Sequence, residues 1–96
     1  MREIKAGRVP GSVLVMAVPP YKADPLKLAY VQVADHMAAR IEAGEFPAET
    51  RLPPERELAD EYGVAYNTLR QAVGVLRDRG LVITLRGHGN YVARRP

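Results

Sequence analysis

The sequence contains no cysteine, no tryptophan and only two histidines, His36 and His88. Without cysteine there can be no disulfide framework, no thiolate-bound zinc and no thiol nucleophile. Two histidines in one small chain also make a metalloenzyme a poor fit, so we expect no metal and no cofactor. No apolar run approaches the roughly 18 residues that span a bilayer, and we expect no membrane segment.

The 96 residues that are present suffice for one small domain with or without a tail. Hydrophobic residues make up 47% and charged residues 26%, which is typical of a globular protein. Three basic residues precede the apolar run 13–18, but this run is shorter than the roughly 7–15 residues of a signal-peptide core, and Pro19 and Pro20 end it. We therefore expect a cytoplasmic protein.

Charge is distributed unevenly along the chain. Residues 25–65 carry four basic and eight acidic side chains, a net charge of −4, whereas residues 66–96 carry six arginines and one aspartate, a net charge of +5. Such a split favours a surface that meets a polyanion. A solvated basic tail would give the same numbers, and charge alone does not separate the two interpretations.

Residues 1–24 are predicted to form an N-terminal extended arm ahead of a domain at residues 25–96. Proline and glycine are frequent in the arm, and its short β-branched run predicts one strand, Ser12–Val18. An exposed strand of this character tends to pair with another edge. It can pair with a hairpin of its own chain, or with a second copy across a two-fold axis, and both arrangements remain open.

A first helix is predicted to start at Asp24 and Pro25, because Asp suits the N-cap and Pro suits the first helical position. Gly44 suits the position after the helix end. The residues of its predicted apolar face recur at helical spacing: Leu26, Tyr30, Val33, Ala34, Met37 and Ile41. His36 lies off this face, and we expect it to be solvated.

Two further helices follow in quick succession. One is predicted to begin near Pro54 and end at Gly63, and the other to begin at Tyr66 or Asn67 and run to Arg79. The link between them has four residues, 63–66. Two helices joined so tightly are typical of a helix-turn-helix.

The apolar period changes to two after residue 80. Residues 81–85 and 90–93 predict two strands, and the glycines at 87 and 89 supply the positive φ angles that the turn between them needs. A helix, a helix-turn-helix and a hairpin in this order predict a winged helix. The expected fold is therefore mainly α, with three helices and a two-stranded wing.

The exposed face of the third helix is predicted to recognise double-stranded DNA. In a helix-turn-helix the second helix of the pair enters the major groove, and its N-terminal residues meet base edges. Asn and Gln pair with adenine, Arg pairs with guanine, and Thr reaches a phosphate or a thymine methyl group. The candidates on this face are Tyr66, Asn67, Thr68, Arg70 and Gln71.

The wing adds a second set of candidates. Arg86 and His88 alternate with Gly87 and Gly89, and such small residues let the backbone approach a phosphate or enter a minor groove. For any single residue a solvated polar face is the simpler explanation. Several of them on one predicted surface favour DNA binding.

The stretch from Tyr30 to Ala93 resembles the DNA-binding domain of the GntR family of bacterial transcription regulators. The resemblance covers about two thirds of the chain, and several segments agree in order and spacing. The matching segments are 41–47, 51–59, 63–64, 67–72, Leu76, 80–82 and 87–92.

This resemblance implies roles for individual residues. Arg56 would contact the DNA backbone or a guanine. Thr68 and Arg70 would lie on the recognition helix, with Arg70 as a principal contact. Gly87 would reach the minor groove, with Arg86 and His88 beside it.

Three positions depart from the family pattern. Ala65 stands where Ser or Thr is usual, so the helix that follows loses a side-chain cap worth about 1 kcal/mol. Tyr66 stands where Arg is common, and a tyrosine cannot make the bidentate guanine contact, so the operator of a relative cannot be transferred to this chain. Thr50 replaces a usual glycine in a loop.

The resemblance also implies an effector-binding and dimerising domain after the wing, and only three residues follow Ala93 here. We expect either a regulator that lacks this domain or an effector portion carried elsewhere. The core of so short a chain is too small for a ligand pocket of a few hundred Å3, so no small-molecule site is expected.

Together these features predict a sequence-specific DNA-binding transcription regulator, by analogy a repressor that occupies a promoter. A homodimer on a palindromic operator is expected, because one helix-turn-helix covers few base pairs. The alternative is a winged-helix module that binds protein without reading DNA. An enzyme is not expected, because the acidic residues that could imitate a catalytic cluster have the spacing of a solvated helix face: Glu55, Glu57, Asp60 and Glu61.

Overall fold

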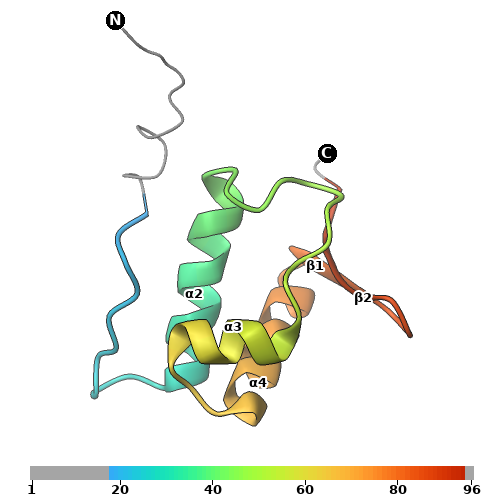
Figure 1. Cartoon of the computed structure of the whole chain (residues 1–96). Coiled ribbons are helices and arrows are strands. Elements are labelled where there is room, and N and C mark those ends of the chain that lie inside the picture. Colours follow the sequence, from blue (N-terminus) through green and yellow to red (C-terminus); the bar gives the residue numbers. More distant parts are fainter. Residues whose placement is uncertain (1–17, 95–96) are drawn as a thin grey trace, which may run out of the picture.

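The structure is a computed structural model, and it describes residues 18–94. Three helices precede an antiparallel hairpin, in the order α2 (Ala29–Glu42), α3 (Glu55–Tyr62), α4 (Tyr66–Asp78), β1 (Val82–Leu85) and β2 (Gly89–Val92) (Figure 1). This order confirms the winged-helix fold, with the hairpin as the wing. All of the predicted strand Ser12–Val18 except Val18 lies outside the described residues, and its pairing therefore stays a prediction.

Helix α4 contributes one complete face to the hydrophobic core and packs against α2, α3 and β1. The buried residues of this face follow the predicted helical spacing: Leu69, Ala72, Val73 and Leu76. From α2 the same core receives Val33, Ala34, Met37 and Ile41. Because one face of α4 is buried in the core, the helix cannot rotate about its axis. Its opposite face therefore stays exposed to solvent, as in a recognition helix.

The predicted start of the first helix is wrong by several residues. Helix α2 begins at Ala29, and Asp24 instead closes a separate turn, in which its carboxylate accepts a hydrogen bond from the Leu26 amide at 2.9 Å. Gln32 of α2 holds this turn in place, accepting from the Asp24 amide at 2.7 Å and donating to the Asp24 carbonyl at 2.8 Å. Aspartate side chains readily satisfy local backbone amides in this way and so compete with helix formation. Leu26 is consequently 92% exposed rather than part of the apolar face.

Helices α3 and α4 begin and end where the sequence predicts. Pro54 is the N-cap of α3, and Gly63 ends that helix in the left-handed conformation at φ 68°. The N-cap of α4 is Ala65, which makes no side-chain capping bond. This confirms the prediction that α4 lacks a side-chain cap. The chain turns within three residues between the two helices, and this fixes the angle at which α4 is presented.

The wing contains one more strand-like segment than the sequence predicts. Strands β1 and β2 pair antiparallel, with Ile83 opposite Tyr91, and β2 begins at Gly89, one residue earlier than expected. On its other side β2 pairs with residues 49–52, where the Leu52 amide donates to the Asn90 carbonyl at 2.8 Å. The loop before α3 is therefore tied to the wing by backbone hydrogen bonds. Thr50, which replaces a usual family glycine, fits this segment, and its hydroxyl donates to the Pro47 carbonyl at 2.6 Å.

Residues 18–24 run alongside α2 (Figure 1), and aromatic contacts join them to α2 and to the end of α3. The ring of Tyr21 packs edge-on against Tyr62 and His36, with ring centroids 5.0 and 5.6 Å away. His36 is not the solvated side chain that the sequence predicts. Its Nε2 lies 2.7 Å from the Pro19 carbonyl and its Nδ1 lies 2.7 Å from the Tyr62 hydroxyl. A carbonyl can only accept, so Nε2 carries the proton, and Nδ1 accepts from the tyrosine.

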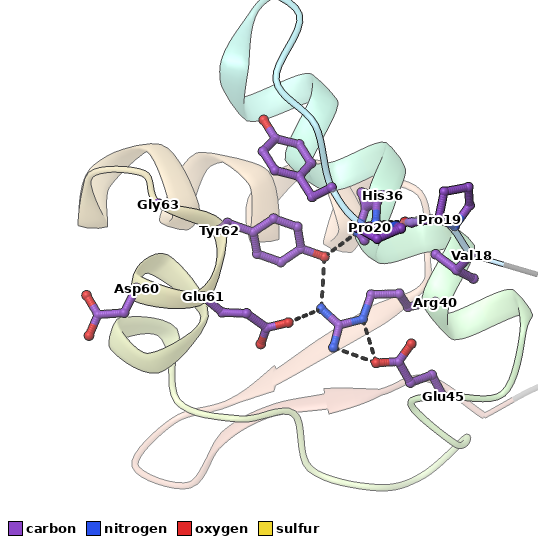
Figure 2. A pocket seen from close by; sticks show the side chains of 11 residues that line it. Val18, Pro19, Pro20, His36, Arg40, Glu45, Asp60, Glu61, Tyr62 and Gly63 are labelled. Atoms are coloured by element: carbon purple, nitrogen blue, oxygen red, sulfur yellow. Dashed lines mark hydrogen bonds and ion pairs between the residues drawn. The ribbon is translucent and has the colours of Figure 1, made fainter. Parts of the chain in front are cut away.

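Arg40 joins α2 to the loop after it and to the end of α3 (Figure 2). Its residue exposure is only 8%. The guanidinium donates to Glu45 through Nε and Nη2 at 2.9 and 2.6 Å, and to Glu61 and the Tyr62 hydroxyl at 2.8 and 3.0 Å. Burial alone would lower the pKa of Arg40, but these hydrogen bonds outweigh it and the pKa lies above its ordinary value. Burial also raises the pKa of Tyr62, although Arg40 opposes that shift.

Among the described residues, no helix is both long and apolar enough to cross a membrane.

We expect the Arg40→Ala variant to lose about 1–3 kcal/mol of stability, because it removes two hydrogen bonds to α3 and two to the loop after α2, and leaves the Tyr62 hydroxyl with one donor fewer. Urea unfolding measures the loss. Arg79→Ala is the matched control, because Arg79 makes one exposed ion pair with Asp35 and should change stability by about 0.5 kcal/mol or less. Equal losses in the two variants would contradict the importance of the Arg40 contacts.

Candidate nucleic-acid interface

Two adjoining hollows bring together most of the predicted recognition residues. One, of about 880 Å3, lies between α4 and the wing, and its lining includes Asn67, Arg70 and Gln71. The other, of about 450 Å3, lies between the start of α3 and the wing, and its lining residues include Arg56, Tyr66, Arg86 and Gly87. Both are also lined by Glu55 and Thr84. We call the walls of these two hollows the recognition surface.

Exposure varies among the nine predicted residues. Seven of them are exposed: Arg56, Asn67, Arg70, Gln71, Arg86, Gly87 and His88. Tyr66 and Thr68 are half-buried. Within the described part of the chain, Thr68 and His88 line neither hollow, so the structure does not group these two with the others.

The recognition surface is strongly basic. Its lining contains five arginines: Arg51, Arg56, Arg70, Arg77 and Arg86. Glu55 is the single carboxylate among the lining residues. Guanidinium groups form strong hydrogen bonds with phosphate oxygens and with the acceptor edge of guanine. A surface of this composition is therefore suited to a nucleic acid.

Glu55 connects the three elements that form the recognition surface. It lies in the first turn of α3, and its side chain is only 22% exposed. One carboxylate oxygen accepts from the side-chain amide (Nδ2) of Asn90, on β2, at 2.9 Å. The other accepts from the Tyr66 hydroxyl of α4 at 3.3 Å and lies 4.0 Å from Nε of Arg70. The sequence analysis assigns Glu55 only to a solvated helix face, whereas the structure shows it joining α3, α4 and the wing.

A short chain of hydrogen bonds continues from Glu55 across the wing. Asn90 is 7% exposed, and its side-chain oxygen accepts from the Thr84 hydroxyl at 2.6 Å. Thr84 in turn accepts from Nη1 of Arg77, in the last turn of α4, at 2.9 Å. The wing is thus held to both ends of the recognition helix, near Tyr66 through Glu55 and near Arg77 through Thr84.

Tyr66 lies between two arginines. The guanidinium carbon of Arg56 is 4.2 Å from the centroid of the tyrosine ring, and that of Arg70 is 5.8 Å from it. Both distances are within the range of a cation–π interaction. The ring of Tyr66 is therefore in contact with two arginines of the recognition surface, Arg56 and Arg70.

The tip of the wing is a tight turn with positive φ angles. Gly87 has φ 78°, and the His88 amide donates to the Leu85 carbonyl at 2.9 Å. Gly89 has φ 108°, and a Cβ atom there would lie 2.9 Å from Nε of Arg51. Gly89 therefore has a second function that its sequence pattern does not reveal: it leaves room for the Arg51 side chain beside the wing.

The acidic residues considered as a catalytic cluster do not gather at one site. Glu55 faces the wing, whereas Glu61 pairs with Arg40 near the other end of α3. The described part of the chain also brings together no group of three or more His, Asp or Glu side chains that could hold a metal ion.

A third hollow, of about 770 Å3, lies away from the recognition surface, between residues 18–21, α2 and the end of α3 (Figure 2). The sequence predicts no hollow of this size. Arg40, its most strongly basic lining residue, is already hydrogen-bonded to Glu45, Glu61 and Tyr62. Figure 2 shows these bonds crossing the hollow, and Tyr62 extends them to His36.

Five polar or charged side chains of the recognition surface were missed as interface residues by the sequence analysis: Arg51, Glu55, Arg77, Thr84 and Asn90. Arg51 and Asn90 do lie in segments that match the family pattern, so their positions gave a usable signal. Arg77 and Thr84 gave none, because their contact depends on how the wing folds back onto α4.

We expect the Asn90→Ala variant to lose about 1–3 kcal/mol of stability, because it removes two partly buried hydrogen bonds and takes a donor from a partly buried carboxylate. Chemical denaturation measures this change. Asn67→Ala, on the exposed face of α4, is the control and should alter stability by about 0.5 kcal/mol or less. If Asn90→Ala behaves like its control, the wing is not held by the Glu55 connection.

Comparison with known proteins agrees with this geometry. The model of the family described as bacterial regulatory proteins, gntR family, matches residues 29–92. The chain is 36% identical over 63 residues to the HTH-type transcriptional regulator SmoD of Agrobacterium fabrum, covering 66% of this chain and 27% of that protein. It is 35% identical over 65 residues to the HTH-type transcriptional repressor NagR of Bacillus subtilis, covering 68% of this chain and 27% of that protein. The chain thus spans about a quarter of the length of these relatives.

Solved structures show the same fold. The DNA-binding domain of AraR in complex with operator ORX1 superposes with a TM-score of 0.66 at 32% identity, over 74% of this chain and 87% of that one. A GntR family transcriptional regulator from Listeria monocytogenes gives a TM-score of 0.72 at 29% identity, over 76% of this chain and 64% of that one. With a family match across most of its length, this chain belongs to the GntR family of bacterial regulatory proteins.

Proposed function

We propose that this chain is a sequence-specific DNA-binding module of a transcription regulator, and that it represses by occupying a promoter. The observation that carries the proposal is the recognition surface, where five arginines and the polar face of α4 surround one carboxylate. Two similar proteins support the proposal: the AraR domain was solved in complex with an operator, and NagR is named a transcriptional repressor.

In the proposed complex α4 enters the major groove. Asn67 and Gln71 are exposed on α4 and can pair with adenine, and Arg70 can pair with guanine. Thr68, half-buried on the same helix, lines neither hollow, and we assign it a phosphate or a thymine methyl group from the chemistry of its side chain. Tyr66 carries no bidentate donor pair and cannot take the place of a guanine-reading arginine.

The remaining residues bind the DNA backbone and the neighbouring groove. Arg56 lies one residue after Glu55 at the start of α3, where a phosphate or a guanine can reach its exposed guanidinium. Arg86, Gly87 and His88 form the exposed turn of the wing, and in the proposed complex they approach the minor groove. This division gives base reading to α4 and positioning to α3 and the wing.

Two copies on a palindromic operator complete the proposal. A single module buries only about 600–1,000 Å2 on DNA, which limits its affinity, and two half-sites about one helical turn apart overcome this limit. In this proposal DNA meets α3, α4 and the wing, whose residues line the two hollows, and α2 and residues 18–24 line neither of them.

The first test selects bound duplexes from random DNA and measures affinity across a salt series. We expect Arg70→Ala to lose about 1–3 kcal/mol of specific binding and to relax selection at one base pair. Arg56→Ala should weaken binding to all sequences and reduce the salt slope by about 0.9 if its partner is a phosphate. Light scattering of the selected complexes should find two chains for each duplex.

Arg79→Ala serves again as control, because its ion pair with Asp35 lies off the recognition surface. Unchanged affinity of both test variants, with folding intact by circular dichroism, would remove the two arginines from the proposed site. If the affinity of the chain for its partner does not fall as the salt concentration rises, a protein partner would be favoured over DNA.

The second test concerns the wing. We expect Arg86→Ala to lower affinity several-fold and to reduce the salt slope by about 0.9, while leaving the bases selected by α4 unchanged. The measurement is the same selection, repeated with the variant. A sharp change in the bases preferred opposite α4 would show that the proposed division of roles is wrong.

A further inference from the structure

We propose that Tyr66 is a positioning residue, whose ring holds the guanidinium groups of Arg56 and Arg70 together so that they meet DNA as one preset pair. In this role the tyrosine itself reads no base. The inference rests on the proposed function and deepens it, because it says how the recognition surface works at the position where this chain departs from the common family arginine.

The hydroxyl of Tyr66 is directed into the protein. It donates to Glu55 at 3.3 Å, and Glu55 is in turn held by Asn90 at 2.9 Å. The tyrosine is half-buried, although it is the first residue of an otherwise exposed helix face. That hydroxyl is the only hydrogen-bonding group of the tyrosine, and its single proton is donated to Glu55, so it cannot also be donated to an acceptor on a base. Here the hydroxyl already has a partner, and what the residue offers the surface is its ring.

Both arginines approach that ring from different elements. Arg56, on α3, places its guanidinium carbon 4.2 Å from the ring centroid, a close stacking distance. Arg70 follows Tyr66 by four residues on α4, on the same side of the helix, and lies 5.8 Å from the centroid. The two cations would otherwise repel each other and move freely, because both are exposed. The ring and the Glu55 carboxylate, 4.0 Å from Arg70, offset the repulsion.

Ordering the two arginines before binding makes binding stronger. A long side chain that becomes immobile in a complex costs about 0.5–1.5 kcal/mol, and a preset conformation reduces that cost. Two guanidiniums fixed together also fit two acceptor groups at a fixed separation. The acceptors are either phosphate oxygens or the O6 and N7 atoms of guanine, and base selection and salt dependence distinguish these two sources.

The experiment compares Tyr66→Phe, which keeps the ring, with Tyr66→Leu, which removes it. In the free protein, nuclear magnetic resonance should show ring-current shifts on the side-chain protons of Arg56 and Arg70 in the wild type and in Tyr66→Phe, and none in Tyr66→Leu. On the selected operator, Tyr66→Leu should bind about 3- to 20-fold more weakly. Tyr66→Phe should stay within about threefold of the wild type and select the same bases.

A double-mutant cycle separates this role from a merely structural one. If the ring acts through Arg56, the loss caused by Tyr66→Leu should become clearly smaller when Arg56→Ala is already present. Melting temperatures identify any loss that comes from unfolding, and the ring-current measurement applies to every variant that remains folded.

Three results would overturn the inference. One is a wild-type chain that binds DNA but shows no ring-current shift on either arginine. Another is a Tyr66→Phe variant that loses selection at a particular base pair, because the hydroxyl would then be reading it. The third is full additivity in the cycle. If the wild-type chain selects no DNA at all, the proposed function itself is wrong, and the role of Tyr66 in binding is withdrawn with it.

Discussion

The spatial relation between the recognition helix and the wing depends on one carboxylate. Glu55 stands in the first turn of α3, accepts hydrogen bonds from β2 and from the start of α4, and lies 4.0 Å from Arg70. Two consecutive helices and the second strand of the wing therefore share one acceptor. The carboxylate also lies close to the Arg70 guanidinium, and so it lowers the repulsion between Arg70 and the neighbouring Arg56 in the free protein. The five arginines of the recognition surface thus share it with one carboxylate of the same chain, that of Glu55.

Local signals decided which parts of this molecule could be predicted from its sequence. Gly63 and Gly80 both adopt positive φ angles after helices, and they marked the ends of α3 and α4 correctly. Asp24 gave an equally strong helix-start signal and was misleading, because the side chain of Gln32 holds its backbone in a separate turn. The strand-like pairing of residues 49–52 uses backbone groups alone, so it left no pattern of side chains to recognise.

The candidate site was predictable as a face and not as a set of contacts. Helical spacing placed Asn67, Arg70 and Gln71 on the solvent side of α4, where they are. It could not reveal that Asn90 donates to Glu55, because no local rule relates a residue of the wing to one at the start of α3. The same holds for His36, whose two partners come from Pro19 and Tyr62. Contacts between elements require the fold to be known first.

The fit between Gly89 and Arg51 has a consequence for building chimeras. The wing looks like a portable loop, and exchanging it between relatives is a natural way to change DNA preference. Yet the Arg51 guanidinium occupies the space that a side chain at position 89 would need, and Arg51 belongs to a different segment. A wing grafted without a glycine there would displace an arginine that was not part of the graft. The smallest transferable unit is therefore the wing together with residues 49–52, to which its backbone is already bonded.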